Sequence, residues 1–416
     1  MKKLSQETVN KNVDYIVDGI KEVITTFGPR APGSKGEADA QEYFAKELGK
    51  YADEVKTQKF TLHPMAFMGW IYFEVAFMLA ALVCLWFNIN IASILLGVTA
   101  ITLAVLQLML YIHVTAPFFP KKTSSNVYAV KKPTGEVKRR IIFCGHTDAA
   151  PEWGALYKGG AGLFETQFIS SLLVIAVVIG MAIAGILVNG FTVFPQSINS
   201  TPLPYLIALI VVTVICTPIV IWLAFFFNPL RTVDGANDNL TANFTAASIL
   251  KTMAEENIAL ENTEVCALMA GSEEAGLRGA MAFAKDFKDE LSDVETIIVV
   301  METLRETDCL CVYTRDLNGI VKTDVEVAAL VKEACKQATG RDIKFSFVPL
   351  GSTDSAAFAL AGLKSTCFAG VNHKLQRYYH TRMDSYDNLS RECLEISYKT
   401  MMKTLELYDK NGLKTE

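Results

Sequence analysis

Residues 141–148 read IIFCGHTD and place an apolar run directly before His146 and Asp148. A short apolar run that is bounded by glycine and polar residues predicts a strand buried in a sheet. The run TIIVVM, residues 296–301, ends in the same way at Glu302. Buried strands in this sequence are therefore expected to end at side chains that can bind a metal.

The rest of the polar sequence alternates such runs with amphipathic stretches of helical length, among them Asn239–Met253 and Val325–Gln337. Strands that alternate with helices predict an α/β fold with a mostly parallel mixed sheet covered by helices. Ligands of such sheets bind outside the carboxyl ends of the strands. The further residues expected at this edge are Glu273, Glu274, Tyr379, His380, and Asp238 in the GANDN turn.

The chain of 416 residues has a hydrophobic content of 51%, and four apolar runs account for the excess over an ordinary globular protein. Each approaches or exceeds the ~20 apolar residues that cross a bilayer, and the last two lack the polar stripe of a soluble core helix. We predict four membrane spans in two hairpins. Glu74 is the one charged residue in them, and we interpret it as lying near the interface, a functional role being the alternative. The runs are Met65–Phe87, Ile91–Ile112, Phe168–Val188 and Leu203–Phe227.

The flanks of the hairpins indicate the orientation. The linkers inside the hairpins, residues 88–90 and 189–202, contain no lysine or arginine, whereas basic residues flank the hairpins outside. The positive-inside rule then places the polar parts in the cytoplasm, in agreement with nine cysteines that form no CxxC pair. The predicted segments are 1–64, 113–166 and 229–416 for one polar domain, and 65–112 and 167–228 for the hairpins.

The charge balance excludes nucleic acid as a partner. The chain has 39 Lys and Arg against 44 Asp and Glu, a net charge of −5, and so offers no basic footprint for a phosphate backbone. The lipid bilayer is the partner that the apolar runs predict. The sequence leaves the oligomeric state open, a homo-oligomer included.

The residues at the sheet edge suit a hydrolytic zinc site. A lone histidine or aspartate is more often structural, but imidazole and carboxylate together, without thiolate, are the ligands of zinc sites that keep positions open for water. We expect Asp238 to bridge two Zn²⁺, one completed by His146 and Glu302 and the other by Glu274 and His380, about 3.5–4 Å apart. The charge of the two ions, +4, is then cancelled by three carboxylates and one hydroxide.

The neighbouring acids Glu273 and Glu274 are expected to have different roles. Adjacent residues of an extended segment point to opposite sides, so that one can bind metal while the other acts as a base. Glu273 would accept the proton of the water that attacks a carbonyl and return it to the leaving amine, typically worth about 10²–10⁴-fold. Asp148 would hold the imidazole of His146 in one tautomer.

Six motifs, in this order, resemble peptidase family M28, the di-zinc aminopeptidases. Two N-terminal segments, GPRAPGSKGEADAQEYFAKEL and SSNVYAV, also look like that family. The motifs are GHTD (145–148), GANDN (235–239), SEEAGLRG (272–279), the acid Glu302, STDSAAF (352–358) and YHTRMDS (379–385).

The resemblance implies the same roles as the chemistry above, and it adds one for Tyr379, which in some relatives donates a hydrogen bond to the tetrahedral intermediate. It also implies a carboxylate near the site at Asp354, whose role is open. Two positions depart from the family: Asn237 replaces a frequent acid, and Glu302 stands where many members have aspartate. The implied metal ligands are His146, Asp238, Glu274, Glu302 and His380, with Glu273 as base and Asp148 behind His146.

The predicted function is a membrane-anchored di-zinc metallopeptidase, an aminopeptidase in the simplest case. Because the second hairpin lies between Asp148 and Asp238, we expect peptides at the membrane as substrates. The alternative is an inactive peptidase-like binding or scaffold module, against which the complete ligand set argues. A transporter would have only Glu74 in its helices, and a cyclising acyltransferase of this fold would bind a single zinc. The sequence leaves open which peptide terminus is trimmed.

Overall fold

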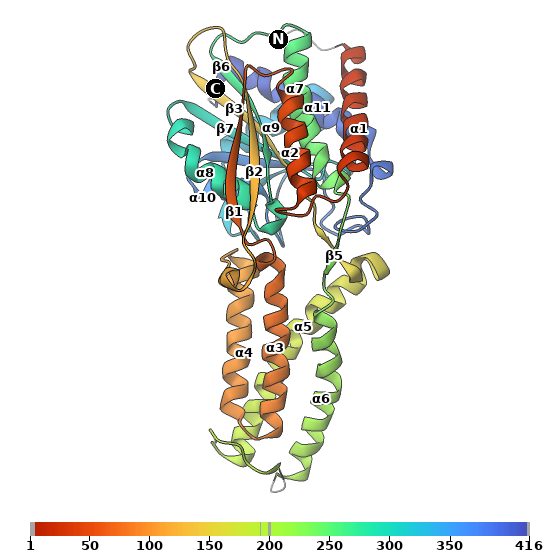
Figure 1. Ribbon diagram of the computed structural model, residues 1–416, viewed down its shortest axis with the longest axis vertical. Coiled ribbons are helices and arrows are strands. Elements are labelled where there is room, and N and C mark those ends of the chain that lie inside the picture. The colour runs from red at the N-terminus through yellow and green to blue at the C-terminus, as the bar shows by residue number, and fades with distance from the viewer. Residues whose placement is uncertain (1–4, 192, 199–200, 414–416) are drawn as a thin grey trace. The chain divides into compact units, whose positions relative to one another are not determined.

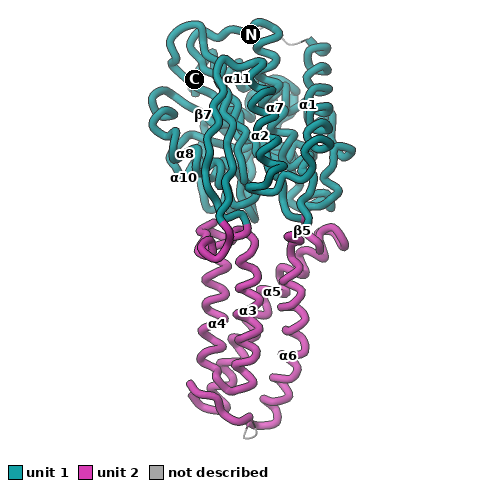
Figure 2. The backbone as a smooth tube through the Cα atoms, in the orientation of Figure 1, with its two compact units in different colours: residues 1–64, 121–151, 230–416 teal, residues 65–120, 152–229 magenta. Residues whose placement is uncertain are grey.

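The computed structural model describes residues 5–191, 193–198 and 201–413. Residues 192, 199 and 200 of the second predicted linker lie outside these residues. The chain forms two compact units (Figure 2). Unit 1 comprises residues 1–64, 121–151 and 230–416, and unit 2 comprises residues 65–120 and 152–229. Unit 2 is therefore larger than the two predicted hairpins, because its longest helix begins at Gly154.

Unit 1 is built on a mixed sheet with the strand order β1-β2-β6-β3-β7-β11-β8-β10, and β9 pairs with β8. At its centre β6, β3, β7 and β11 run parallel, and antiparallel pairs flank them. The predicted mixed α/β sheet is confirmed. The strands are β1 (Glu54–Leu62), β2 (Lys122–Lys131), β3 (Arg139–His146), β6 (Thr263–Ala270), β7 (Glu295–Glu302), β8 (Cys311–Asp316), β9 (Val321–Lys322), β10 (Lys344–Phe347) and β11 (Lys364–Ala369), with β4 (Pro151–Glu152) and β5 (Asn228–Thr232) in a separate pair.

Helices cover both faces of the sheet (Figure 1). Strand residues alternate between the faces: Val127 and Ala129 of β2 join the main core, whereas Tyr128 packs on the ring of Phe283 in α8, 5.0 Å between centroids. One face carries α1 (Gln6–Phe27), α2 (Lys35–Leu48), α7 (Thr241–Glu255), α9 (Val325–Thr339) and α11 (Arg391–Asn411), and the other carries α8 (Arg278–Leu291) and α10 (Asp354–Leu360). The short helices of unit 1 are η4 (Ala236–Leu240), η5 (Glu273–Ala275), η6 (Thr307–Cys309) and η7 (Tyr386–Asn388).

The register of the central strands brings their carboxyl ends to one level. His146, the last residue of β3, pairs with Ala270 at the end of β6. Glu302, the last residue of β7, pairs with Ala369 at the end of β11. The predicted site residues that follow these strands are therefore gathered at one edge of the sheet.

The described residues of unit 2 form four helices that are long and apolar enough to cross a membrane. Helix α4 continues through a π-helical turn, η1, so that its apolar segment reaches Met109. Helix α5 contains one non-helical residue, Gly160, where φ is 68°. The helices are α3 (Ala66–Trp86), α4 (Asn90–Ala104) with η1 (Val105–Met109), α5 (Gly154–Asn189) and α6 (Leu203–Leu223), and η2 (Ala116–Phe118) is a short turn.

The outer surface of these helices is apolar. Leu95, Leu187 and Val214 are 62%, 82% and 66% exposed, and in α6 only 17% of the most apolar window is buried inside the protein. A continuous apolar surface of this kind is not expected to face water. The inner faces meet in a core around Leu82, Val178 and Leu209, which holds the helices together.

Candidate metal centre

Asp238 lies between two histidines that are far apart in the sequence, His146 at the end of β3 and His380 in the segment after β11. Its Oδ1 atom lies 3.1 Å from Nε2 of His146, and its Oδ2 atom lies 3.0 Å from Nε2 of His380. Each oxygen of one carboxylate thus faces a different imidazole. This is the arrangement that a carboxylate bridging two cations requires.

A glutamate completes each side of this arrangement. On the side of His146, Oε2 of Glu302 lies 3.9 Å from the histidine Nε2, and on the side of His380, Oε1 of Glu274 lies 3.3 Å from Nε2. In both groups of three, the ligand atoms lie within 4.8 Å of one another. The structure thus brings together all five residues that the sequence analysis selects as ligands.

Glu273 and Glu274 lie on a short 3-10 helix, not on the extended segment expected from the sequence. The carboxylate of Asp148 explains the turn, because it accepts the backbone N–H groups of Glu273 and Glu274, both at 2.9 Å. Glu273 also approaches the site, with Oε2 at 3.9 Å from His146 Nε2, and it forms a third possible ligand group with His146 and Glu274. The sequence analysis predicted only a contact between Asp148 and His146. In the structure, Oδ1 of Asp148 lies 3.4 Å from Nδ1 of His146.

A second acid, Asp384, holds the turn that carries Asp238, as Asp148 holds the turn that carries Glu274. Asp384 accepts hydrogen bonds from the backbone N–H groups of Asn237 and Asp238, at 2.8 and 3.1 Å. The side-chain amide of Asn237 donates to the same carboxylate at 2.8 Å, which an acid at position 237 would do only if protonated. Asn239 donates to Glu302 Oε2 at 3.0 Å. Asn237, which stands where the M28 family often has an acid, is therefore suited to its position, because its side-chain amide donates to Asp384.

The N-terminal segment supplies two supports that sequence reasoning missed. The buried guanidinium of Arg30 donates to the carbonyl of Thr147 at 2.8 Å and to that of Gly235 at 3.1 Å, so that it links the loops of His146 and Asp238. The carboxylate of Glu37 accepts the N–H and Oγ of Ser272 at 2.7 and 2.9 Å. The only signal in the sequence was that both residues belong to the segment that resembles the M28 family.

Three non-glycine residues of this edge have left-handed backbone conformations. The values of φ are 54° at Ser272, 44° at Thr303 and 50° at His380. Such conformations cost on the order of 1–3 kcal/mol each and are concentrated at functional sites. Here they adjoin Glu273 and Glu302 or belong to the candidate ligand His380.

Burial and mutual repulsion dominate the electrostatics. Burial, together with the charge of Asp238, raises the pKa of Glu274 and of Glu302 well above the usual range. Burial alone would also raise the pKa of Asp238, but the hydrogen bonds of His146 and His380 outweigh it and lower the pKa. These buried acids can all be ionised only with positive charge between them. Two divalent cations would supply it, and the donor set of imidazoles and carboxylates is one that Zn²⁺ takes.

Two further residues of the sequence analysis lie at the site. The ring of Tyr379 stacks on that of His380, with centroids 4.1 Å apart, and burial raises the pKa of Tyr379 well above its usual value, so that its phenol stays protonated. Asp354, the first residue of α10, is buried, and neither of its carboxylate oxygens has a hydrogen-bond partner among the described residues.

Comparison with known proteins agrees with this site. Residues 224–405 match the model of peptidase family M28, a range that contains four of the five candidate ligands but not His146. No curated protein matches the chain. Similar solved structures include the aminopeptidase from Aneurinibacillus sp. strain AM-1, at 14% identity, covering 97% of this chain and 96% of that one with a TM-score of 0.55. BSAP, a zinc aminopeptidase from Bacillus subtilis, is similar at 13% identity, 97% and 96% coverage and a TM-score of 0.55.

A glutaminyl cyclase from Fimbriiglobus ruber shares the fold as well, at 14% identity, 95% coverage of both chains and a TM-score of 0.55. Identities this low establish the fold alone, and the family match adds the sequence evidence. Together they define the class of the protein as a zinc-dependent peptidase. Over residues 224–405 the chain is similar to peptidase family M28.

Proposed function

We propose that this chain is a membrane-anchored di-zinc aminopeptidase, which removes residues from the amino terminus of peptides. The observation that carries the proposal is the position of Asp238, whose two carboxylate oxygens face His146 and His380 at 3.1 and 3.0 Å. The similar structures named as aminopeptidases support the choice of reaction.

The proposed ligands of one zinc are His146, Asp238 and Glu302, and those of the other are Asp238, Glu274 and His380. When bound, zinc ions lower the pKa of water and stabilise negative charge on a carbonyl oxygen. The hydrogen bonds of Asp148 and Asp384 fix the turns that carry these ligands, so that the ligand positions are set before any substrate arrives.

We assign the proton transfer to Glu273. Its carboxylate reaches the site, yet among the described residues only His146 Nε2 lies within ion-pair distance of it, at 3.9 Å. The carboxylate of Glu302, by contrast, accepts hydrogen bonds from Asn239 and Thr303, both at 3.0 Å. A carboxylate without fixed hydrogen bonds is suited to accept a proton from water and to pass it to the leaving amine. Tyr379 would donate a hydrogen bond to the oxygen of the attacked carbonyl.

The four apolar helices are proposed to anchor the enzyme in a bilayer, with unit 1 in the cytoplasm. The proposal rests on their length and composition and on the basic flanks of the hairpins. Peptides that are released at the membrane are the proposed substrates. Unequal turnover of membrane-associated and soluble peptides by the enzyme in liposomes would support this choice, whereas equal turnover would contradict it.

A second reaction shares this fold, because two of the similar structures are glutaminyl cyclases. The decisive experiment gives detergent-purified protein three peptides: one with a free amino-terminal leucine, the same peptide N-acetylated, and one with amino-terminal glutamine. We expect release of free leucine from the first peptide only. Cleavage of the acetylated peptide would contradict aminopeptidase activity, and cyclisation of the glutaminyl peptide without hydrolysis would favour the cyclase.

A further inference from the structure

Unit 2 buries one acid among its apolar helices. Glu74 is the ninth residue of α3, about 12 Å along the helix axis from Ala66. It is only 3% exposed, and its Oε2 atom has no hydrogen-bond partner among the described residues. The structure encloses Glu74 between helices, and its position near the membrane interface stays a prediction of the sequence analysis.

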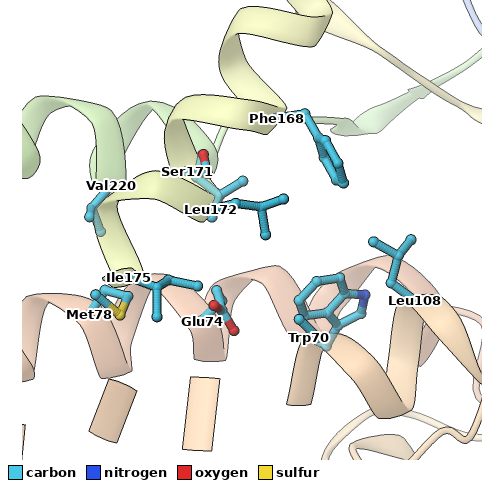
Figure 3. Close-up of a pocket in the computed structure, with 11 residues that line it drawn as sticks. Trp70, Glu74, Met78, Leu108, Phe168, Ser171, Leu172, Ile175 and Val220 are labelled. Atoms are coloured by element: carbon cyan, nitrogen blue, oxygen red, sulfur yellow. The ribbon is translucent and has the colours of Figure 1, made fainter. Parts of the chain in front are cut away.

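A pocket opens in front of this carboxylate (Figure 3). The pocket has a volume of about 480 Å³ with the open space at its mouth included, and residues from all four helices line it. Besides Glu74, the only other lining residue with a hydroxyl or charged group is Ser171, whose Oγ donates to the carbonyl of Gln167 at 2.7 Å. The remaining wall is apolar and includes Trp70, Leu172 and Ile175.

The protein offers no cation to Glu74 from the helices around it. The described residues of α3, α4 and α6 include no lysine, arginine or histidine, and the one basic residue of α5, Lys158, is exposed. A buried carboxylate without a partner is costly, and in an apolar environment such a group marks a functional site. The missing donor is therefore expected to come from a ligand.

We propose that this pocket binds a primary ammonium group carried on an apolar chain. An ammonium has three N–H donors and a positive charge for Glu74, and the apolar wall accommodates the chain. Such an ammonium has two sources at a membrane, the amino terminus of a hydrophobic peptide and the headgroup of an amine-bearing lipid. The inference uses unit 2 alone and does not depend on peptidase activity.

The test titrates the full-length protein in detergent with dodecylamine and, as a control, with dodecanol. A brominated dodecylamine that quenches tryptophan fluorescence reports binding, and Trp70→Phe assigns the quenching to the pocket. We expect saturable binding by the wild type, about tenfold weaker binding by Glu74→Gln, and unchanged binding by Glu165→Gln, an exposed acid of α5. Equal affinity of Glu74→Gln and wild type, or equal affinity for amine and alcohol, would overturn the proposal.

A second variant keeps the test independent of the stability of Glu74→Gln. Leu172 lines the pocket and is 47% exposed, so Leu172→Trp fills the space without entering the core. It should abolish binding while Glu74 is retained. Displacement of the probe by trileucine amide would identify the peptide source, and displacement by phosphatidylethanolamine but not phosphatidylcholine would identify the lipid source. Displacement by neither would count against the proposal.

Discussion

The carboxylate of Asp148 provides a sharp test of how the site is held. It accepts the backbone N–H groups of Glu273 and Glu274, both at 2.9 Å, and lies 3.4 Å from His146 Nδ1. Asp148→Asn keeps the shape but replaces one acceptor oxygen by an NH₂ group. One of the two buried N–H groups then loses its partner, which costs about 2–3 kcal/mol, because unmade buried hydrogen bonds cost about 1–3 kcal/mol and charged ones are the stronger.

The loss should appear in metal binding as well as in stability. Partners of metal ligands typically contribute about 10–100-fold to affinity or activity, and we expect a decrease of that size in zinc affinity. The assay is competition with a zinc chelator, combined with peptide hydrolysis and denaturant unfolding of the detergent-purified protein. Asp289→Asn, at an exposed position of α8, is the matched control and should change none of these quantities. Zinc affinity of Asp148→Asn within twofold of wild type would refute the reasoning.

Three other predictions concern the base, the N-terminal support and the orientation. Glu273→Gln should keep the zinc content of wild type but lower turnover about 10²–10⁴-fold, whereas full activity would exclude Glu273 as the base. Arg30→Met should lower the free energy of unfolding by about 3–5 kcal/mol, because two buried carbonyls lose a charged donor. The control Arg315→Met, at an exposed position, should have little effect. Equal unfolding midpoints of Arg30→Met and wild type would contradict this role of Arg30. In intact cells a membrane-impermeant maleimide should label Val193→Cys, in the linker between α5 and α6. It should label Asp308→Cys, in unit 1, only after permeabilisation. The reverse labelling pattern would show that unit 1 lies outside the cytoplasm.

The parts of the site that the sequence predicted are those set by local pattern. Apolar strands that end at His146 and Glu302 are recognisable from short windows, and the parallel topology then brings their ends together. The four apolar helices follow from composition in the same way.

The parts that escaped prediction depend on contacts between distant segments. Arg30 supports the site only because its loop packs against the turns of Thr147 and Gly235, and no local pattern reveals this. The turn at Glu273 was expected to be extended because its cause, a pair of hydrogen bonds to Asp148, links residues more than 100 positions apart. The burial of Glu74 could not be predicted from the sequence, because it depends on packing between α3 and α5.

The central claim is that the carboxylate of Asp238 lies between two zinc ions. Its most direct test is a crystal structure of the zinc-loaded protein, with anomalous scattering recorded on both sides of the zinc absorption edge. We expect two anomalous peaks, one beside His146 and Glu302 and the other beside Glu274 and His380, with one oxygen of Asp238 at each. A single peak, or peaks away from Asp238, would contradict it.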